Sequence, residues 1–105
     1  MKVKRGDRRP GATITCKDGA ALVDLTAADS MRLIGKMDGA SGFPLIDRPI
    51  TGNAAGEVVI DSWEVGDTAT VGTLHLEVEV TWGDGAPQTF PVDGFLCVQI
   101  VPDLG

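Results

Sequence analysis

The sequence predicts an all-β protein made of two antiparallel sheets that pack face to face. Apolar and polar residues alternate with a period of two along most of the 105 residues, whereas helix signals are scarce. The chain also contains 14 glycines and six prolines, which mark frequent reversals of direction. About seven or eight short strands, with turn signals every ~8–12 residues, are typical of a single-domain β-sandwich.

The clearest strand covers Val71–Trp82. Its alternation places polar residues, His75 among them, on one face and a set of apolar side chains on the other. The apolar set is Leu74, Leu76, Val78, Val80 and Trp82. Gly83-Asp84-Gly85 ends this strand as a hairpin turn, because glycine permits the positive φ that such turns need. A short edge segment at Gln88–Pro91 and a last strand at Phe95–Val101 follow.

The first part of the chain contains shorter strands separated by turns. Trp63 ends one of them and is expected to anchor the core. A single helical turn, capped by Thr26, is all that the pattern at Thr26–Arg32 allows. Residues 37–56 are expected to form a loop that carries one short strand. The expected strands are Ala12–Lys17, Leu22–Leu25, Asp29–Lys36, Leu45–Ile50 and Glu57–Trp63, with turns at Asp18-Gly19 and Gly66-Asp67-Thr68.

The charges are divided unevenly along the chain. Residues 1–10 have a net charge of +4, whereas the other 95 residues have a net charge of −10. The sequence therefore predicts a basic N-terminal arm over residues 1–10 and a single sandwich domain over residues 11–105. The arm is expected to fold back, to bind an acidic surface of a neighbouring molecule, or to remain solvated. Its basic residues are Lys2, Lys4, Arg5, Arg8 and Arg9.

Metal and redox chemistry find little support in the sequence. Cys16 and Cys97 are the only cysteines, and neither a CxxC motif nor a His/Cys cluster occurs, so no zinc site is expected. Both cysteines lie in apolar stretches and are expected as buried thiols rather than as a disulfide. Asp61, Glu64 and Asp67 could offer oxygen ligands to calcium, but their spacing is not that of an EF-hand. We expect no metal and no cofactor.

Enzymatic signals are weak as well. His75 is the only histidine, and the polar face of a regular strand is more often a surface position than a catalytic one. The chain contains no GxSxG, GxxxxGK[ST] or GxGxxG motif. The sequence therefore favours a protein that is not an enzyme.

Nucleic acids and membranes are also unexpected partners. The net charge is −6, and no aromatic residue lies within the basic segment to stack on bases. No apolar run approaches the ~20 residues that span a bilayer. No hydrophobic segment follows the basic start, so we expect synthesis in a cytoplasm. In the loop over residues 37–56, Phe43, Ile46 and Ile50 either contact a partner or close one end of the sandwich.

Short motifs follow one another along nearly the whole chain. Together they resemble, in order and spacing, the immunoglobulin-like N-terminal domain of phage upper baseplate proteins. The motifs are Val3–Pro10 (VKRGDRRP), Asp18–Thr26 (DGAALVDLT), Gly56–Trp63 (GEVVIDSW), Asp67–Leu74 (DTATVGTL), Trp82–Pro91 (WGDGAPQTFP) and Ile100–Leu104 (IVPDL). Leu74 departs from the family, which often has a tyrosine at this position. The chain also stops at Gly105, where baseplate relatives continue, so the module is expected to stand alone.

The resemblance implies an immunoglobulin-like sandwich and a structural role in the virion of a tailed phage. It implies docking on other virion proteins as a tail, baseplate or head–tail accessory component that is present in several copies. The alternatives are a minor capsid protein that decorates the head and an immunoglobulin-like module that binds the host surface. Removal of residues 2–9 is expected to abolish incorporation into the particle and to leave the melting temperature nearly unchanged.

Overall fold

The computed structural model of the protein describes residues 1–91 and 96–104. Within these ranges the chain forms ten β-strands and one turn of 3₁₀ helix, which confirms the all-β prediction. The elements are β1 (Lys2–Lys4), β2 (Ala12–Thr15), β3 (Lys17–Asp18), β4 (Ala21–Leu22), η1 (Leu25–Ala27), β5 (Ala28–Met37), β6 (Ile46–Pro49), β7 (Glu57–Ile60), β8 (Gly72–Trp82), β9 (Pro87–Phe90) and β10 (Leu96–Val101).

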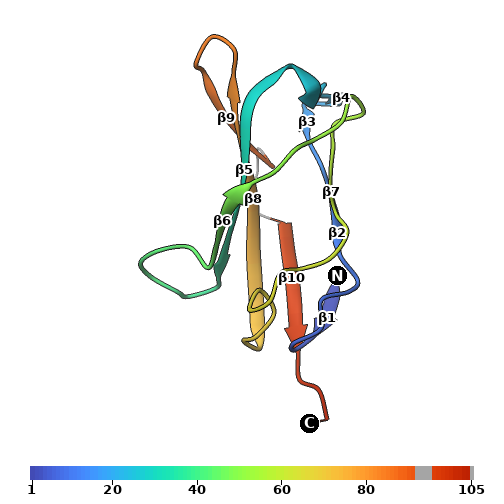
Figure 1. Cartoon of the computed structure of the whole chain (residues 1–105), viewed down its shortest axis with the longest axis vertical. Helices are drawn as coiled ribbons and strands as arrows, with labels where there is room; N and C mark the ends of the chain where they lie inside the picture. The colour runs from blue at the N-terminus through green and yellow to red at the C-terminus, as the bar shows by residue number, and fades with distance from the viewer. Residues whose placement is uncertain (92–95, 105) are drawn as a thin grey trace.

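The strands form one large sheet and two small ones. The order of the main sheet is β1-β10-β8-β5-β6, and β9 also pairs with β8. Its pairs are antiparallel except that of β1 with β10, which is parallel. The strands β2 and β7 form an antiparallel ribbon that lies across from the main sheet, and β3 and β4 form a hairpin at one end of the molecule (Figure 1).

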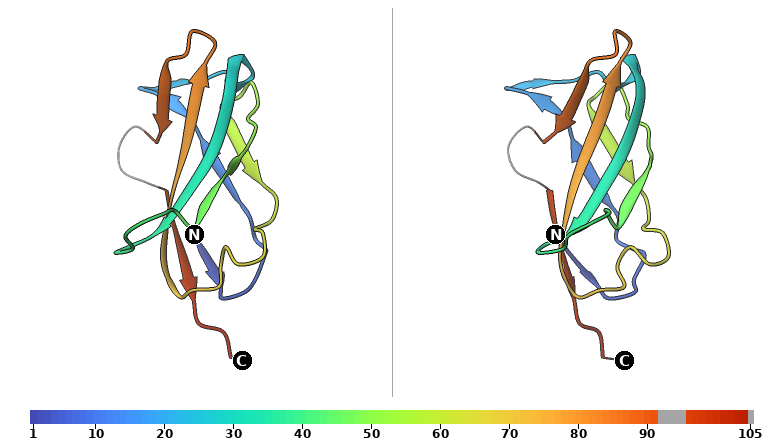
Figure 2. Two further views of the ribbon diagram at one scale, coloured as in Figure 1. Left: turned by 60° about the vertical axis from the view of Figure 1, so that its left-hand side comes forward. Right: turned by 90° about the vertical axis from the view of Figure 1, so that its left-hand side faces the viewer.

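Strand β8 is the centre of the main sheet. It pairs with β5 from Leu74 to Trp82, so β5 occupies one of its edges. The other edge is shared, because β10 pairs with residues 72–76 and β9 with residues 78–81. The turn between β8 and β9 contains Gly85, whose φ of 85° is in the region that glycine tolerates best. Figure 2 shows β5 and β8 side by side as the longest strands of the molecule.

The predicted faces of β8 are confirmed. Leu74, Leu76, Val78 and Val80 are 0% exposed, and they pack in one cluster with apolar side chains of the β2–β7 ribbon. Trp82 lies at the end of the strand and is only partly buried against that cluster. The ribbon contributes Ile14, Val58 and Ile60, and β5, β6 and β10 contribute Met31, Leu33, Ile46, Val98 and Ile100. The hydrophobic effect of this shared core holds the two layers together.

The first ten residues fold back on the main sheet, which is one of the alternatives that the sequence left open, and they do so as a strand that the sequence did not predict. Strand β1 is an edge strand of the main sheet, in which Val3 pairs with Ile100 and is only 2% exposed. Val3 is a single apolar residue among basic ones, so no alternation of apolar and polar residues indicated a strand here. Removal of residues 2–9 would take Val3 out of the core and uncover the edge of β10. The expectation of an unchanged melting temperature therefore no longer holds.

Other sequence predictions need smaller corrections. The helical turn is η1, one residue earlier than expected, and its cap is the side chain of Asp24, which accepts a hydrogen bond from the backbone N–H of Thr26. Hydrogen bonds from the side chain and the backbone of Thr26 lower the pKa of the Asp24 carboxyl. Cys16 is buried as predicted, but Cys97 is exposed. These two described cysteines do not form a disulfide. Phe95, the predicted start of the last strand, lies outside the described residues.

No helix in the described part of the chain is long and apolar enough to cross a membrane.

The two faces of β8 can be tested with adjacent residues. Leu76→Ala should lower the free energy of unfolding by about 2–5 kcal/mol, because it leaves a cavity in the core. His75→Ala, on the opposite face, should change it by less than about 1 kcal/mol. Urea denaturation of the two variants measures both values, and equal losses would contradict the assignment of the faces.

Candidate docking surface

The basic segment is held at the edge of the main sheet by main-chain contacts. Beyond the pairing of β1, the backbone N–H of Arg5 donates to the Val101 carbonyl at 2.8 Å, and that of Gln99 donates to the Met1 carbonyl at 2.9 Å. Because residues alternate along a strand, Lys2 and Lys4 are exposed whereas Val3 points into the core. The two ammonium groups are therefore presented by a fixed strand.

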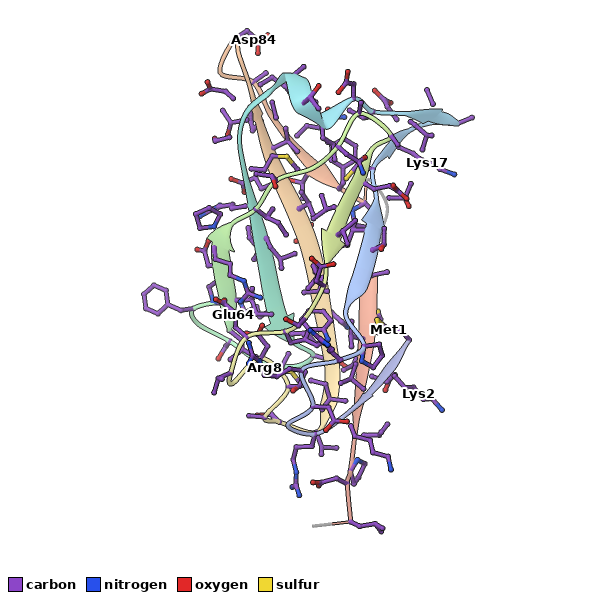
Figure 3. All side chains as sticks on the ribbon, turned by 45° about the vertical axis from the view of Figure 1, so that its right-hand side comes forward. Met1, Lys2, Arg8, Lys17, Glu64 and Asp84 are labelled. Carbon is purple, nitrogen blue, oxygen red and sulfur yellow. The ribbon has the colours of Figure 1, made fainter. Side chains whose placement is uncertain are left out.

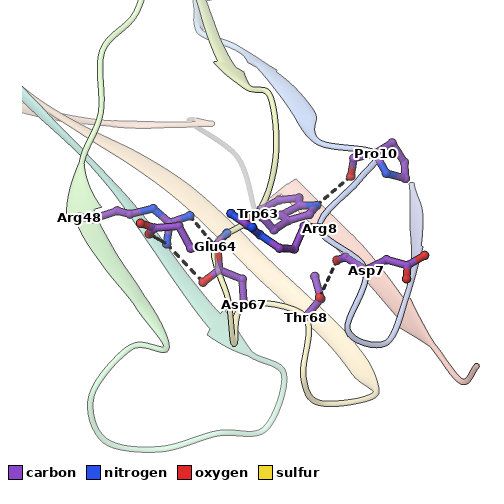
Figure 4. A network of polar contacts seen from close by, with 8 residues as sticks. All are labelled: Asp7, Arg8, Pro10, Arg48, Trp63, Glu64, Asp67 and Thr68. Carbon is purple, nitrogen blue, oxygen red and sulfur yellow. Dashed lines mark hydrogen bonds and ion pairs between the residues drawn. The ribbon is translucent and has the colours of Figure 1, made fainter. Parts of the chain in front are cut away.

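The loop after β1 is fastened to the core by Trp63. The indole Nε1–H of this fully buried residue donates to the Pro10 carbonyl at 2.8 Å (Figure 4). Its backbone N–H donates to the Arg8 carbonyl at 2.8 Å, and its own carbonyl accepts from the Arg8 Nε at 2.8 Å. The buried polar groups of the tryptophan are thus satisfied by the N-terminal loop.

The same loop is also tied to the turn before β8. The Thr68 hydroxyl donates to the Asp7 carbonyl at 2.7 Å, and the Thr68 carbonyl accepts from the backbone N–H of Gly6 at 2.9 Å. Thr68 is only 2% exposed, so these bonds form at the boundary of the core. Together with Trp63, this residue fixes the path of the chain from Gly6 to Pro10.

The five predicted basic residues have different surroundings. Arg5 forms an ion pair with Asp103 at 2.7 Å, and Arg8 is bound to Trp63. Lys2, Lys4 and Arg9 are exposed, and no ion pair to them occurs within residues 1–91 and 96–104. Met1, Lys2 and Arg8 lie in the half of the molecule away from Asp84 and the β3 residue Lys17 (Figure 3). These exposed cations are the part of the predicted site that is available to a partner.

A second group of charges surrounds Arg48 on β6. Its guanidinium donates to the two carboxylate oxygens of Asp67, at 3.2 Å from Nη1 and 2.8 Å from Nη2, and lies 2.8 Å from Glu64. Asp67 is only 5% exposed, and it also accepts a hydrogen bond from the backbone N–H of Glu64. The hydrogen bonds to Asp67 raise the pKa of Arg48, and the charges of Asp67 and Glu64 raise it further.

This arrangement changes the interpretation of the three acidic residues considered for calcium. Glu64 and Asp67 come together, but both face Arg48, and Asp61 is exposed. Among the described residues, no three His, Cys, Asp or Glu side chains gather in a geometry that suits a metal ion. The pair of Arg48 and Asp67 instead ties the edge strand β6 to the turn before β8.

Of the three residues predicted as loop contacts, only Phe43 is exposed. Phe43 is 99% exposed, but Ile46 is 1% exposed in the core and Ile50 packs against the core. Ile46 and Ile50 therefore pack in or against the core and are not exposed contacts for a partner. Sequence reasoning missed Leu45 and Val65, which are 48% and 87% exposed and line one hollow. That neighbourhood arises from two segments distant in sequence.

His75 lies on the outer face of β8, half-buried, as its place in the strand predicted. It lines a hollow with Lys36, Asp38 and Glu77. Its cross-strand neighbours in the sheet are Lys36 on β5 and Cys97 on β10. The second neighbour could not be predicted from local sequence, because the register of β8 and β10 brings together residues 22 positions apart.

Comparisons with known proteins returned no family model, no curated protein and no solved structure that matches this chain.

The contact between Arg48 and Asp67 should matter far more to stability than the neighbouring surface pair. Asp67→Asn should lower the free energy of unfolding by about 1.5–3 kcal/mol, because it weakens charge-assisted hydrogen bonds at a buried acceptor. Glu64→Gln removes an exposed partner of the same arginine and should cost less than about 1 kcal/mol. Urea denaturation of both variants distinguishes them, and a larger loss in Glu64→Gln would contradict this view.

The two thiols should differ in reactivity. Burial raises the pKa of Cys16, which leaves this thiol protonated and shielded, whereas Cys97 is exposed. Titration of the native protein with an aromatic disulfide reagent should modify one thiol per chain, and two after unfolding. Cys97→Ser should abolish the native reaction and Cys16→Ala should preserve it. Two reactive thiols in the native state would refute the expected burial of Cys16.

Proposed function

We propose that this protein is a non-enzymatic structural component of a tailed-phage virion, with an immunoglobulin-like β-sandwich fold that docks on other virion proteins. The order of the strands supports the fold. In immunoglobulin-like sandwiches, strands B and E lie in one sheet and strands C, F and G in the other. Here β2 pairs with β7, while β5, β8 and β10 lie together in the main sheet and β6 extends it as C′ does. The chain crosses between the layers in the same order.

The virion role rests on the resemblance to the N-terminal domain of phage upper baseplate proteins. Two of the shared motifs lie where the structure gives them a defined task. VKRGDRRP begins at Val3 within β1 and includes the loop bound to Trp63, and GEVVIDSW covers β7 and Trp63 itself. The two motifs therefore contact each other, because Trp63 after β7 holds the loop that follows β1.

The observation that carries the docking role is the rigid presentation of Lys2 and Lys4. They extend from a strand that is paired with β10, and ordering them on a partner costs less conformational entropy than ordering a tail. The other 95 residues have a net charge of −10, so the basic segment differs in sign from the rest of the protein. An acidic surface on a neighbouring virion protein would be attracted to this segment and oriented by it.

A second candidate function is favoured by one specific observation. Phe43 is almost fully exposed, and Leu45, two residues later, lines a hollow with Val65, Arg8 and Arg48. Exposed aromatic and arginine side chains are enriched in protein–protein interfaces. A host-surface-binding module would use this surface. Loss of binding to host cells in Phe43→Ser, with normal incorporation into particles, would favour this alternative.

The docking role is tested by charge reversal rather than by deletion, because β1 is part of the sheet. Particles assembled with the double variant Lys2→Glu/Lys4→Glu should contain at least about tenfold less of the protein, measured by quantitative mass spectrometry of purified virions. Both side chains are exposed, so the melting temperature should remain within ~1 °C of that of the unmodified protein.

The matched control is Lys17→Glu, which reverses an exposed lysine on β3 in the other half of the molecule. This variant should be incorporated normally. Normal incorporation of the double variant would refute docking through the basic segment, and absence of the unmodified protein from purified virions would refute the virion role.

A further inference from the structure

Strand β1 is the last strand of the main sheet on one side, so only one of its two edges is paired with β10. The N–H and carbonyl groups of successive residues in a strand point alternately to its two edges. The Met1 carbonyl and the Arg5 N–H both bond to β10, which shows that the odd-numbered residues face that strand. The main-chain groups of Lys2 and Lys4 therefore point to the other edge, here called the free edge of β1.

Three of the four main-chain groups on the free edge are open to a partner. The Lys4 carbonyl accepts a hydrogen bond from the backbone N–H of Asp7 at 3.0 Å, in a turn where Gly6 has a φ of 82°. For the N–H and carbonyl of Lys2 and the N–H of Lys4, no backbone partner occurs within residues 1–91 and 96–104. An edge strand with such groups is a template for the addition of another strand.

The side chains of β1 determine which strand this edge would select. Lys2 and Lys4 are exposed on the face of the sheet turned away from the core, whereas Val3 between them packs in the core. Opposite charges directly across two strands are favourable, and like charges are unfavourable. Pairing with β1 of a second copy would place lysines beside lysines. A strand with carboxylates at alternate positions would instead place each of them beside an ammonium group.

The opposite edge of the main sheet, at β6, is less suited to strand addition. The backbone N–H of Ile50, just after β6, donates to the Met31 carbonyl on β5 at 3.2 Å, so Asp47 and Pro49 direct their main-chain groups outward. Pro49 has no N–H to offer, and proline is one of the residues that protect edge strands from pairing. The carboxylate of Asp47 lies 3.3 Å from Arg32 in an ion pair. Of these two edges, the one at β1 is therefore the receptive edge.

We propose that the free edge of β1 binds an extended acidic segment of a partner protein by strand addition, with carboxylates beside Lys2 and Lys4. Main-chain hydrogen bonds to the three open groups fix the register, and the two charge pairs select the segment. The residue between the two acidic ones faces the same side as Val3, which favours an apolar side chain there. This inference rests on the proposed docking role and names the form of the segment that docks.

The binding test uses the purified full chain and a synthetic peptide with blocked ends, Ser-Thr-Glu-Val-Glu-Val-Glu-Thr-Ser, as the probe. Isothermal titration calorimetry should detect binding that weakens as salt is added, because exposed charge pairs are screened. The same peptide with lysine in place of glutamate should not bind.

Two N-methylated versions of the peptide distinguish strand addition from charge attraction alone. Methyl groups on the amide nitrogens of the glutamates block one edge of the extended peptide, and those on the valines block the other. One version should bind as the parent peptide does, and the other at least about tenfold more weakly, because its main-chain bonds to β1 are lost. Equal affinities of the two versions would overturn strand addition.

Amide hydrogen exchange, measured by NMR on the unmodified protein, locates the bound peptide. The N–H groups of Lys2 and Lys4 point to the free edge, so their exchange should slow at least about tenfold when the peptide is saturating. The N–H of Val3 faces β10 and should change less. Unchanged exchange at both lysines would overturn the proposal.

The charge variants separate this inference from the docking role. Lys2→Glu/Lys4→Glu should bind the peptide at least about tenfold more weakly at an unchanged melting temperature, and Lys17→Glu should bind it normally. If the peptide does not bind the unmodified protein but the double variant is lost from virions, strand addition is refuted and docking through the basic segment stands. If the peptide binds but the double variant is incorporated normally, the docking role is refuted and β1 remains a site of strand addition.

Discussion

The burial of Trp63 is the constraint on which the rest of the N-terminal half depends. An indole that is fully removed from water needs an acceptor for its N–H, since an unsatisfied donor in the core costs about 1–3 kcal/mol. The Pro10 carbonyl is that acceptor, and the main chain of Trp63 is bound to Arg8 on the same stretch. These bonds hold residues 8–10 against Trp63, directly after β1 at the edge of β10. A basic sequence that would be solvated on its own becomes part of the sheet.

A second set of buried polar contacts lies near β6, at the opposite edge of the main sheet from β1. Asp67 is buried beneath Arg48, and the pair joins β6 to the turn that leads into β8. The next residue, Thr68, binds the N-terminal loop. One short turn thus connects both edges of the main sheet, from β6 to the loop after β1. Loss of Asp67 would loosen this turn, and with it the support of the loop that positions the basic segment.

The sequence was sufficient for those features that arise from local alternation. Apolar and polar residues alternate over residues 74–80 because one face of β8 is buried against the ribbon and the other is not, so both faces could be predicted from the sequence. Trp63 was predictable as a core residue because it follows a run of apolar residues. The strand β1 was not predictable, since its one buried residue, Val3, gains its place through parallel pairing with a strand 97 residues later.

The candidate sites were harder to predict than the core for a related reason. The basic residues were visible in the composition, but only the structure shows that Arg5 and Arg8 are engaged while Lys2 and Lys4 are presented. Phe43 and Ile46 are equally apolar in the sequence, and they differ because strand β6 begins at Ile46 and turns its side chain into the core. The proximity of His75 to Cys97 depends on the register of β8 with β10, which no local motif encodes.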